Sequence, residues 1–294
     1  MTRMRAAHII QLKSPPEPVE VDDVEGVRIE AVALNPLDIA IGNGVFYGGH
    51  PPLPYSPGCE AVGRTGDGAL VYLFGDGYGV SKSGFLAERV DVPDDLPLRL
   101  PDGVDPALAV VSGIAGVAAW VSVAWKAKVT PADRVLVLGA TGTVGRIAMQ
   151  AAKLLGAERV VGASRSAGNG LVGLDEIADA FGEEGFTVCI DPIWGEPLAG
   201  ALSAGAHHAR VVHLGQAAGP EAPLKSADVR SKELLIQGHS NFALSKAERE
   251  RAQLELLDHL VAGRITLDYE TFVLDDVRDA WAHQSVGKKA VVTL

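Results

Sequence analysis

The feature that most constrains the fold is a short apolar strand that opens into a helix through a turn of small residues. Residues 134–139 read Arg-Val-Leu-Val-Leu-Gly, residues 140–145 read Ala-Thr-Gly-Thr-Val-Gly, and residues 146–155 carry apolar side chains at helical spacing. A second apolar strand, 160–163, follows at the spacing of a β-α-β unit. Strands joined in this way lie parallel, so the sequence predicts a parallel sheet covered by helices.

The same alternation continues beyond this first unit. The expected strands are 134–139, 160–163, 187–191 and 210–215, and the expected helices are 144–155, 173–181 and 195–204. This succession of β-α-β units is typical of a doubly wound α/β domain, the Rossmann type.

The first part of the chain has a different pattern. Up to about residue 110, short strands such as 6–12 and 27–34 are separated by segments rich in Pro and Gly, which indicates a β-rich, barrel-like unit. A helix is expected over 107–120, with helical turns continuing toward Lys126, and a last strand within 286–294 is expected to return to the first domain. A length of 294 residues favours two domains, because single cores stop growing near ~250 to 300 residues.

The turn of small residues predicts a dinucleotide site. Backbone N–H groups at such a turn and at the helix start bind a pyrophosphate, and Gly145 allows the helix to pack close to the strand. Ala140 stands where the usual G-x-G-x-x-G pattern has its first glycine. The alternative is a turn that needs glycine for steric reasons only, which the β-α-β context disfavours. The expected contacts are Ala140, Thr141, Gly142, Thr143, Val144 and Gly145.

The end of the second strand indicates which dinucleotide binds. NAD-selective sites carry an Asp or Glu there, which bonds the adenosine ribose and repels a 2′-phosphate. Here the strand is followed by Ser164, Arg165 and Ser166, without an acid. Hydroxyl and guanidinium groups bind phosphate, so the sequence predicts NADPH. The alternative is that Arg165 is a solvated loop charge.

Charge and cysteine content narrow the class of protein. A net charge of −11 and a sequence pI near 5.2 disfavour nucleic acids and anionic membranes as partners. Cys59 and Cys189 are the two cysteines, and the second lies in an expected buried strand, so a disulfide is not expected. Neither a leader-like segment nor an apolar run of ~18 residues occurs, and we expect a cytoplasmic protein that acts on small molecules.

Several segments resemble the zinc-independent quinone oxidoreductases of the medium-chain dehydrogenase/reductase superfamily. The glycine turn resembles their A-x-x-G-x-x-G-type signature, and Ala118 departs from their G-x-T-A-W stretch, where Thr is usual. The other matching segments are 32–38 with Asn-Pro-x-Asp, 53–60 with Pro-Gly-x-Glu, 116–120, 260–265 and 287–292. The chain is shorter than the family pattern within 63–84 and 168–184, where loops shape the substrate cleft.

The resemblance implies an α/β protein of two domains. A GroES-like β-barrel domain would span residues 1–110, completed by 268–294, and a Rossmann domain with a doubly wound parallel sheet would span 111–267. The active cleft would lie at their junction. The family is usually a homodimer formed through the Rossmann sheets.

The resemblance also implies residues near the nicotinamide and the substrate. Asn35 and Asp38 match family residues beside the nicotinamide, and Phe46 or Tyr47 takes the place of a family tyrosine. We expect Asn35, Asp38 and Tyr47 as catalytic residues, with Phe46, Cys59 and Trp194 in the substrate cleft. The further cofactor contacts would be Gly215, Gln216, Asn241 and Phe242. Alternatively, Asp38 only caps a helix that begins after Pro36, and the two aromatic side chains are loop packing.

No metal is expected. Asn35 and Cys59 stand at positions where the zinc alcohol dehydrogenases of the superfamily carry ligands, and the four cysteines of a structural zinc site are missing. Cys59 and Glu60 alone would make a poor metal site, because two neighbouring ligands lack a third. His213, in an expected strand, is interpreted as a core histidine.

These observations together predict an NADPH-dependent, metal-free oxidoreductase. Without a metal to polarise a carbonyl, hydride delivery to a quinone or to an α,β-unsaturated carbonyl compound is favoured. One alternative is an enone reductase confined to a single pathway. Another is a regulatory protein of the same fold that binds the nucleotide without turnover.

Overall fold

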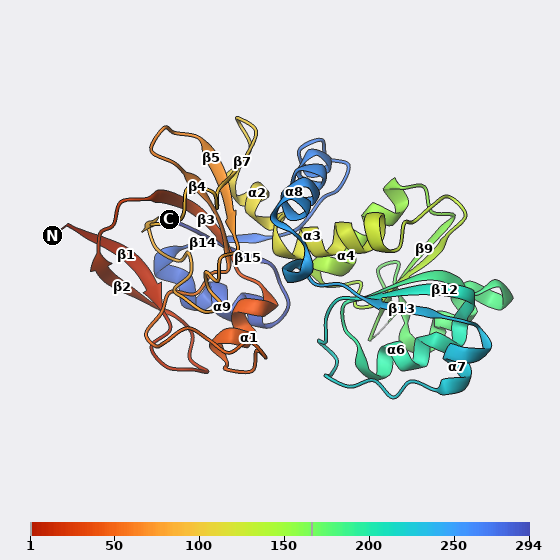
Figure 1. The fold of residues 1–294 in the computed structure, drawn as a ribbon. Coiled ribbons are helices and arrows are strands. Elements are labelled where there is room, and N and C mark those ends of the chain that lie inside the picture. The colour runs from red at the N-terminus through yellow and green to blue at the C-terminus, as the bar shows by residue number, and fades with distance from the viewer. Residues whose placement is uncertain (1, 166) are drawn as a thin grey trace. The chain divides into compact units, whose positions relative to one another are not determined.

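The structure is a computed structural model that describes residues 2–165 and 167–294. The chain forms two compact units (Figure 1). The first comprises the residues up to Ile114 together with Asp268–Leu294, and the second comprises Ala115–Leu267. The chain thus leaves the first unit once and returns to it near its end.

The first unit is built on a mixed sheet with the strand order β14-β15-β3-β4-β5-β7, in which β6 also pairs with β3. Its strands are β3 (Val27–Ala33), β4 (Glu60–Arg64), β5 (Leu70–Phe74), β6 (Arg89–Val90), β7 (Leu98–Arg99), β14 (Glu270–Val273) and β15 (Ala290–Thr293). A hairpin of β1 (Arg3–His8) and β2 (Glu17–Asp22) forms a separate antiparallel pair. Because β15 pairs with β3, the C-terminal segment completes the first sheet.

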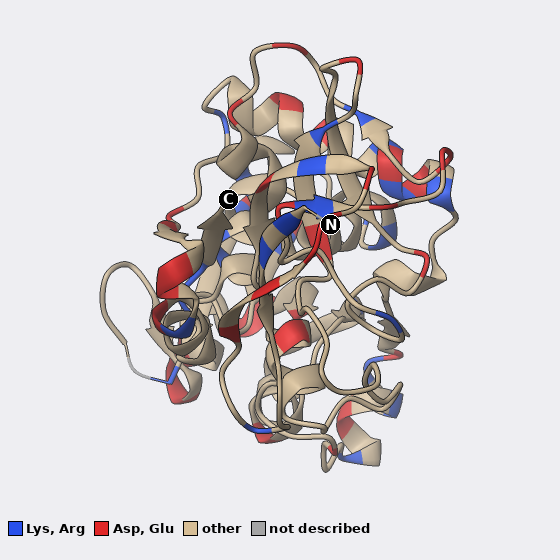
Figure 2. Ribbon diagram, turned by 90° about the vertical axis from the view of Figure 1, so that its left-hand side faces the viewer, with Lys and Arg blue, Asp and Glu red and all other residues tan. Residues whose placement is uncertain are grey.

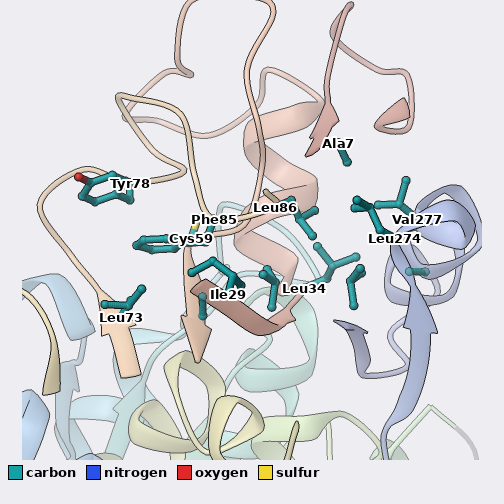
Figure 3. Close-up of a cluster of buried hydrophobic side chains, with 14 of the residues drawn as sticks. Ala7, Ile29, Leu34, Cys59, Leu73, Tyr78, Phe85, Leu86, Leu274 and Val277 are labelled. Atoms are coloured by element: carbon teal, nitrogen blue, oxygen red, sulfur yellow. The ribbon is translucent and has the colours of Figure 1, made fainter. Parts of the chain in front are cut away.

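Three α-helices accompany this sheet in the part of the first unit that the structure describes: α1 (Pro36–Gly42), α2 (Pro106–Val111) and α9 (Val277–Ser285). The 3-10 turn η6 (Leu274–Asp276) leads into α9. Side chains from the strands and from the C-terminal segment meet in one buried cluster (Figure 3). Leu34, Cys59 and Phe85 of the N-terminal part lie in this cluster with Leu274 and Val277. The two segments of the first unit therefore share one core.

The second unit contains a parallel sheet with the order β10-β9-β8-β11-β12-β13. Its strands are β8 (Arg134–Val137), β9 (Arg159–Ser164), β10 (Val172–Gly173), β11 (Phe186–Asp191), β12 (Gly205–His213) and β13 (Leu235–Gly238). The order reverses between β8 and β11, as in a doubly wound fold, and this switch point is where such sheets bind ligands. The predicted Rossmann architecture is confirmed.

Helices connect the parallel strands of the second unit. They are α4 (Thr143–Leu154), α5 (Ile177–Phe181), α6 (Gly195–Ala201) and α7 (Ser226–Ser231), with the 3-10 turns η2 (Leu174–Glu176), η3 (Gly182–Glu184) and η4 (Leu202–Ala204). The 3-10 turn η5 (Asn241–Ala243) and α8 (Lys246–Val261) follow the last strand of the sheet. Val135, Leu136 and Val137 of β8 are fully buried. A parallel strand covered on both faces needs a continuous apolar run, which is why this segment is so apolar.

The single helix expected over 107–120 is wrong in detail. α2 ends at Val111, α3 (Ile114–Trp120) follows, and a π-helix η1 (Val121–Lys126) continues it. Gly113 lies at the break, and a Cβ atom there would be 1.8 Å from Glu60 Oε2 and 2.5 Å from the Tyr72 hydroxyl oxygen. Only glycine fits beside this buried carboxylate, and the helix is interrupted where the Ile114 N–H donates to Glu60 Oε2 at 2.6 Å.

Charged residues of both signs lie interspersed along the ribbon (Figure 2). Ion pairs such as Arg3 with Asp22 and Arg278 with Glu17 hold the β1–β2 hairpin and its neighbours. Among the described residues, no helix is both long enough and apolar enough to cross a bilayer.

Candidate functional site

The glycine turn connects β8 to α4 in the second unit. Leu138 donates its N–H to the Ile190 carbonyl at 3.0 Å, which continues the sheet pairing by one residue. Gly139 then turns the chain with φ 59°, a conformation that favours glycine. Gly142 is the N-cap of α4, and its N–H donates to the Gly139 carbonyl at 3.0 Å. The chain thus passes from strand to helix within a few residues.

Two glycines of this turn face different surroundings. A Cβ atom on Gly145 would lie 2.4 Å from the Gly139 carbonyl oxygen and 2.7 Å from Ala140 Cα, so only glycine fits there. On Gly142 the nearest neighbour would be 3.5 Å away, so this position is open. Gly145 therefore sets the close packing of helix and strand, and Gly142 leaves free space beside the first N–H groups of α4. Such N–H groups have no partner within the helix and bind anionic oxygens.

The end of β9 lies beside the turn. The Ala140 N–H donates to the Ala163 carbonyl at 3.1 Å, so Ser164 and Arg165 follow directly after a residue bonded to the turn. Ser164 is half-buried and the Arg165 side chain is exposed. Ser166, which the sequence groups with them, lies outside the described residues. The arrangement offers a hydroxyl and a guanidinium at the position where the second strand of such folds meets the adenosine ribose.

The remaining expected cofactor residues lie after β12 and β13. Gly215 fits closely against the next loop, since a Cβ atom on it would lie 2.4 Å from the Pro192 carbonyl oxygen. Gln216 is exposed, and Phe242 is 48% exposed. Asn241 is buried, with its Oδ1 atom 3.0 Å from His239 Nε2. At the carboxyl edge of the sheet, the expected cofactor residues therefore include exposed side chains as well as one, Asn241, that is buried and bonded within the protein.

In the first unit, the buried side chain of Asp38 connects two segments by hydrogen bonds. Its Oδ2 atom accepts the Asn35 N–H at 2.8 Å at the start of α1, and its Oδ1 atom accepts the N–H groups of Gly58 and Cys59 at 3.1 and 2.9 Å. Asp38 is 2% exposed, and this burial raises its pKa although the hydrogen bonds oppose the shift. The helix-capping alternative describes the contact with Asn35, and the bonds from Gly58 and Cys59 go beyond it.

Asn35 belongs to a buried polar network. Its Nδ2 donates to Glu60 Oε1 at 2.7 Å, and its Oδ1 accepts from Lys289 Nζ at 2.8 Å. Glu60 Oε2 accepts the Tyr72 hydroxyl at 2.8 Å and the Ile114 N–H at 2.6 Å. Lys289 Nζ lies 3.7 Å from Glu60 Oε1. These contacts join the N-terminal strands to the C-terminal segment through buried polar atoms.

Burial dominates the ionisation of this network. It raises the pKa of Glu60, while Lys289 and the donors on Asn35, Ile114 and Tyr72 oppose that shift. It likewise lowers the pKa of Lys289, with Glu60 as the main opposing charge. Sequence reasoning identified Asn35 but missed Lys289, although the 287–292 segment that carries it was noted as part of the resemblance.

The thiol of Cys59 is fully buried. Burial raises its pKa well above the ordinary value, and the Asp38 carboxylate adds to the shift, so the group is a protonated thiol near neutral pH. In the described part of the chain, no three His, Cys, Asp or Glu side chains lie close enough to hold a metal ion.

Two aromatic side chains lie on the loop that follows α1. The ring centroids of Phe46 and Tyr47 are 4.4 Å apart, and Tyr47 is 85% exposed. The phenol of Tyr47 is therefore open to solvent within its own unit, whereas Asn35, Asp38 and Cys59 are enclosed.

Trp194 is half-buried in the loop after β11, at the carboxyl edge of the parallel sheet. Its ring lies 4.1 Å from that of His213, which in turn is 3.1 Å from Asp191 Oδ2. The sequence placed Trp194 at a strand end but interpreted His213 as a core histidine. The signal that would have found the pair is that Asp191 ends the expected strand 187–191 and His213 lies near the end of the expected strand 210–215 of the same parallel sheet.

The chain resembles known proteins in sequence and in structure. No family model matches the chain. Human quinone oxidoreductase is 28% identical over 251 residues, which cover 79% of this chain and 75% of that protein. The quinone oxidoreductase of Thermus thermophilus, whose structures include a complex with NADPH, is 27% identical with a TM-score of 0.81 and covers 99% of this chain and 100% of its own.

A further solved structure agrees in fold. The yhdH oxidoreductase of Salmonella enterica, solved in complex with NADP, is 22% identical with a TM-score of 0.80, over 100% of both chains. In sequence and in fold, the chain is thus similar to quinone oxidoreductases.

Proposed function

We propose that the protein is an NADPH-dependent oxidoreductase that reduces a quinone or an α,β-unsaturated carbonyl compound. The observation that carries the proposal is the glycine turn with Arg165 beside it, at a strand end that lacks an acidic residue. The NADPH complex of the Thermus thermophilus relative supports the same cofactor.

The geometry of the turn fits a dinucleotide. The open space at Gly142 and the N–H groups of residues 143–145 suit a pyrophosphate. Ser164, Arg165 and Ser166 would hold the 2′-phosphate, because a guanidinium offers paired donors for phosphate oxygens. Gly215, Gln216, Asn241 and Phe242 would border the nicotinamide nucleotide, since they follow strands beyond the switch point.

When bound, the cofactor supplies a hydride to an electrophilic carbon of the substrate. The chain's own residues would bind and orient the reactants, and orientation alone lowers a barrier by several kcal/mol. Tyr47 and Phe46 would contact the substrate, with the exposed Tyr47 phenol as a hydrogen-bond donor to a carbonyl oxygen. Trp194 would border the same substrate from the sheet edge.

The side chains of Asn35, Asp38 and Cys59 are buried, so they would act from beneath the protein surface that contacts the substrate. Asp38 fixes the start of α1 to the 58–59 segment, and Asn35 is held between Glu60 and Lys289. We therefore propose that they hold the wall of the cleft in place. The donor set favours chemistry without a metal, because the Asn35 amide is already bonded on both sides and the Cys59 thiol is protonated.

We also propose a homodimer joined through the parallel sheets. β13 is the edge strand of its sheet, and Leu235 on it is 54% exposed. An exposed edge strand with an apolar side chain is a surface on which a second copy can extend the sheet.

The experiment that tests the cofactor proposal is a calorimetric titration with NADPH and with NADH. Arg165→Ala removes a charged contact with the 2′-phosphate and is expected to weaken NADPH by roughly 1.5 to 3 kcal/mol, with NADH little changed. Lys153→Ala is the matched control, because it removes an exposed cation from the last turn of α4, away from the turn.

The outcomes separate the candidate functions. Equal loss of NADPH affinity in Arg165→Ala and Lys153→Ala would mean that Arg165 acts only through the overall electrostatic field of the protein. If the wild type binds neither NADPH nor NADH, the proposal is refuted. Tight NADPH binding without oxidation across quinones and enones would point to a regulatory nucleotide-binding protein. Turnover confined to one enone would point to a reductase dedicated to a single pathway.

A further inference from the structure

A buried acid and an imidazole meet at the carboxyl edge of the parallel sheet. Asp191 and His213 are the last residues of β11 and β12 and are direct partners across these strands. His213 Nδ1 lies 3.1 Å from Asp191 Oδ2, Asp191 is fully buried, and the His213 side chain is 28% exposed. Because a buried carboxylate accepts hydrogen bonds, it holds the ring with its Nδ1–H directed at Asp191.

The other oxygen of Asp191 shapes the loop that follows. Asp191 Oδ1 accepts the N–H of Ile193 at 3.1 Å and that of Trp194 at 2.8 Å. The Ile193 carbonyl in turn accepts the Ala218 N–H at 2.7 Å. A Cβ atom on Gly139 would lie 2.7 Å from Ile193 Cγ2, so the loop packs directly against the glycine turn. The loop that Asp191 holds thus contacts both neighbouring loops of the edge through Ile193.

Trp194 has a backbone conformation that is costly for its residue type. Its φ is 59° and its ψ is −160°, a region that glycine adopts freely and residues with a Cβ atom avoid. The Trp194 ring contacts the His213 ring in a tilted arrangement, with centroids 4.1 Å apart and an interplanar angle of 40°. Strain of this kind persists where surrounding contacts impose it, and such positions gather at ligand sites.

The position of the loop within the sheet indicates the ligand. The strand order reverses between β8 and β11. In folds of this type the glycine turn and the next strand bind the adenosine half of a dinucleotide, and the strands beyond the switch point bind the other half. Asp191, His213 and Trp194 all lie beyond that point.

We infer that Asp191, His213 and Trp194 form a positioning unit for the nicotinamide nucleotide half of the dinucleotide. Asp191 fixes the backbone of the loop, and His213 supports the Trp194 ring, so that the loop forms a rigid wall beside the glycine turn. If the loop relaxed, Ile193 and Trp194 would move away from the glycine turn. The inference rests on the proposed function and adds that the strained loop sets affinity for one half of the cofactor.

The test compares a whole dinucleotide with its adenosine half. Binding of NADPH and of 2′,5′-ADP is measured by calorimetry for the wild type, for His213→Phe, which keeps a ring but loses the bond to Asp191, and for Trp194→Gly, which relieves the strain. Both variants are expected to weaken NADPH about tenfold and to leave 2′,5′-ADP within about twofold. Arg165→Ala is the control on the other half, because it should weaken both ligands.

Thermal unfolding shows whether the variants stay folded. Trp194→Gly is expected to keep or raise the melting temperature while it weakens NADPH, because glycine adopts this backbone conformation freely. Equal loss of affinity for NADPH and for 2′,5′-ADP, or unchanged NADPH affinity in both variants, would overturn the positioning unit and leave the proposed function standing. If the wild type binds neither ligand, the proposed function fails and this inference fails with it.

Discussion

At the scale of single residues, the two glycines of the turn are predicted to behave differently. Gly145→Ala places a Cβ atom 2.4 Å from the Gly139 carbonyl oxygen and should lower the free energy of unfolding by ~1 to 3 kcal/mol. Gly142→Ala meets nothing closer than 3.5 Å and should change it by less than ~0.5 kcal/mol. Urea denaturation gives both values.

The variants Gly145→Ala and Gly142→Ala also separate an effect on stability from an effect on NADPH binding. Gly142→Ala fills the space proposed for the pyrophosphate, so a folded variant that no longer binds NADPH is expected. Full NADPH affinity in this variant would place the pyrophosphate elsewhere.

A second prediction concerns the buried network of the first unit. Lys289→Met removes the cation 3.7 Å from Glu60 Oε1 and should cost ~3 to 5 kcal/mol, because it leaves a buried carboxylate without its charge partner. Adding Glu60→Gln removes that carboxylate's charge, so the double variant should recover part of the loss. A double-mutant cycle by urea denaturation measures the coupling, and strictly additive losses would mean that the two groups do not interact.

A third prediction concerns pH. Burial lowers the pKa of His239 below its ordinary value of 6.5, although the hydrogen bond with Asn241 opposes the shift. The unfolded state then takes up a proton that the folded state does not. This contribution to stability is present above pH 6.5 and is lost as the pH falls below it, by up to about 1.4 kcal/mol per pH unit.

His239→Gln removes this dependence. The difference in unfolding free energy between wild type and variant should therefore shrink between about pH 7.5 and about pH 5.5. A constant difference over this range would show that His239 does not titrate on unfolding.

At the scale of elements, one carboxylate joins α8 to the segment that contains the π-helix. Glu255 Oε2 accepts the indole N–H groups of Trp120 and Trp125 at 2.8 and 3.2 Å, and Glu255 Oε1 accepts from Arg251 at 2.7 Å. Glu255→Ala should lower the free energy of unfolding by ~1.5 to 3 kcal/mol, because two indole donors lose a charged acceptor.

The matched control for this element is Glu250→Ala on the same helix. Glu250 pairs with Lys246 along the helix surface, and such pairs contribute less than ~0.5 kcal/mol. Similar losses in the two variants would mean that the tryptophan contacts add nothing, and changes in tryptophan emission on replacing Glu255 alone would locate the effect.

Elements were predictable from the sequence where their pattern is local. The strand and helix around the glycine turn follow from a continuous apolar run and from helical spacing. The helix over 107–120 was predicted as one piece, because nothing near Gly113 reveals that the Glu60 carboxylate, distant in sequence, interrupts it.

At the scale of the whole molecule, the chain builds two units from three stretches of sequence. The C-terminal strand β15 pairs with β3, and Leu274 and Val277 enter the same core as Leu34 and Phe85. The family resemblance of the closing segment implied a first domain of residues 1–110 completed by 268–294, and those domain bounds stay a prediction.

The sequence by itself determined the fold class and the presence of the glycine turn, because periodicity and small-residue spacing are properties of neighbouring residues. The roles of Asn35, Asp38, Tyr47 and the cofactor residues stay predictions. Only the tertiary structure decided which polar groups meet in the interior. Glu60 reaches Lys289 because β4 and β15, far apart in sequence, both pair with β3. Asp191 reaches His213 because β11 and β12 lie side by side in register.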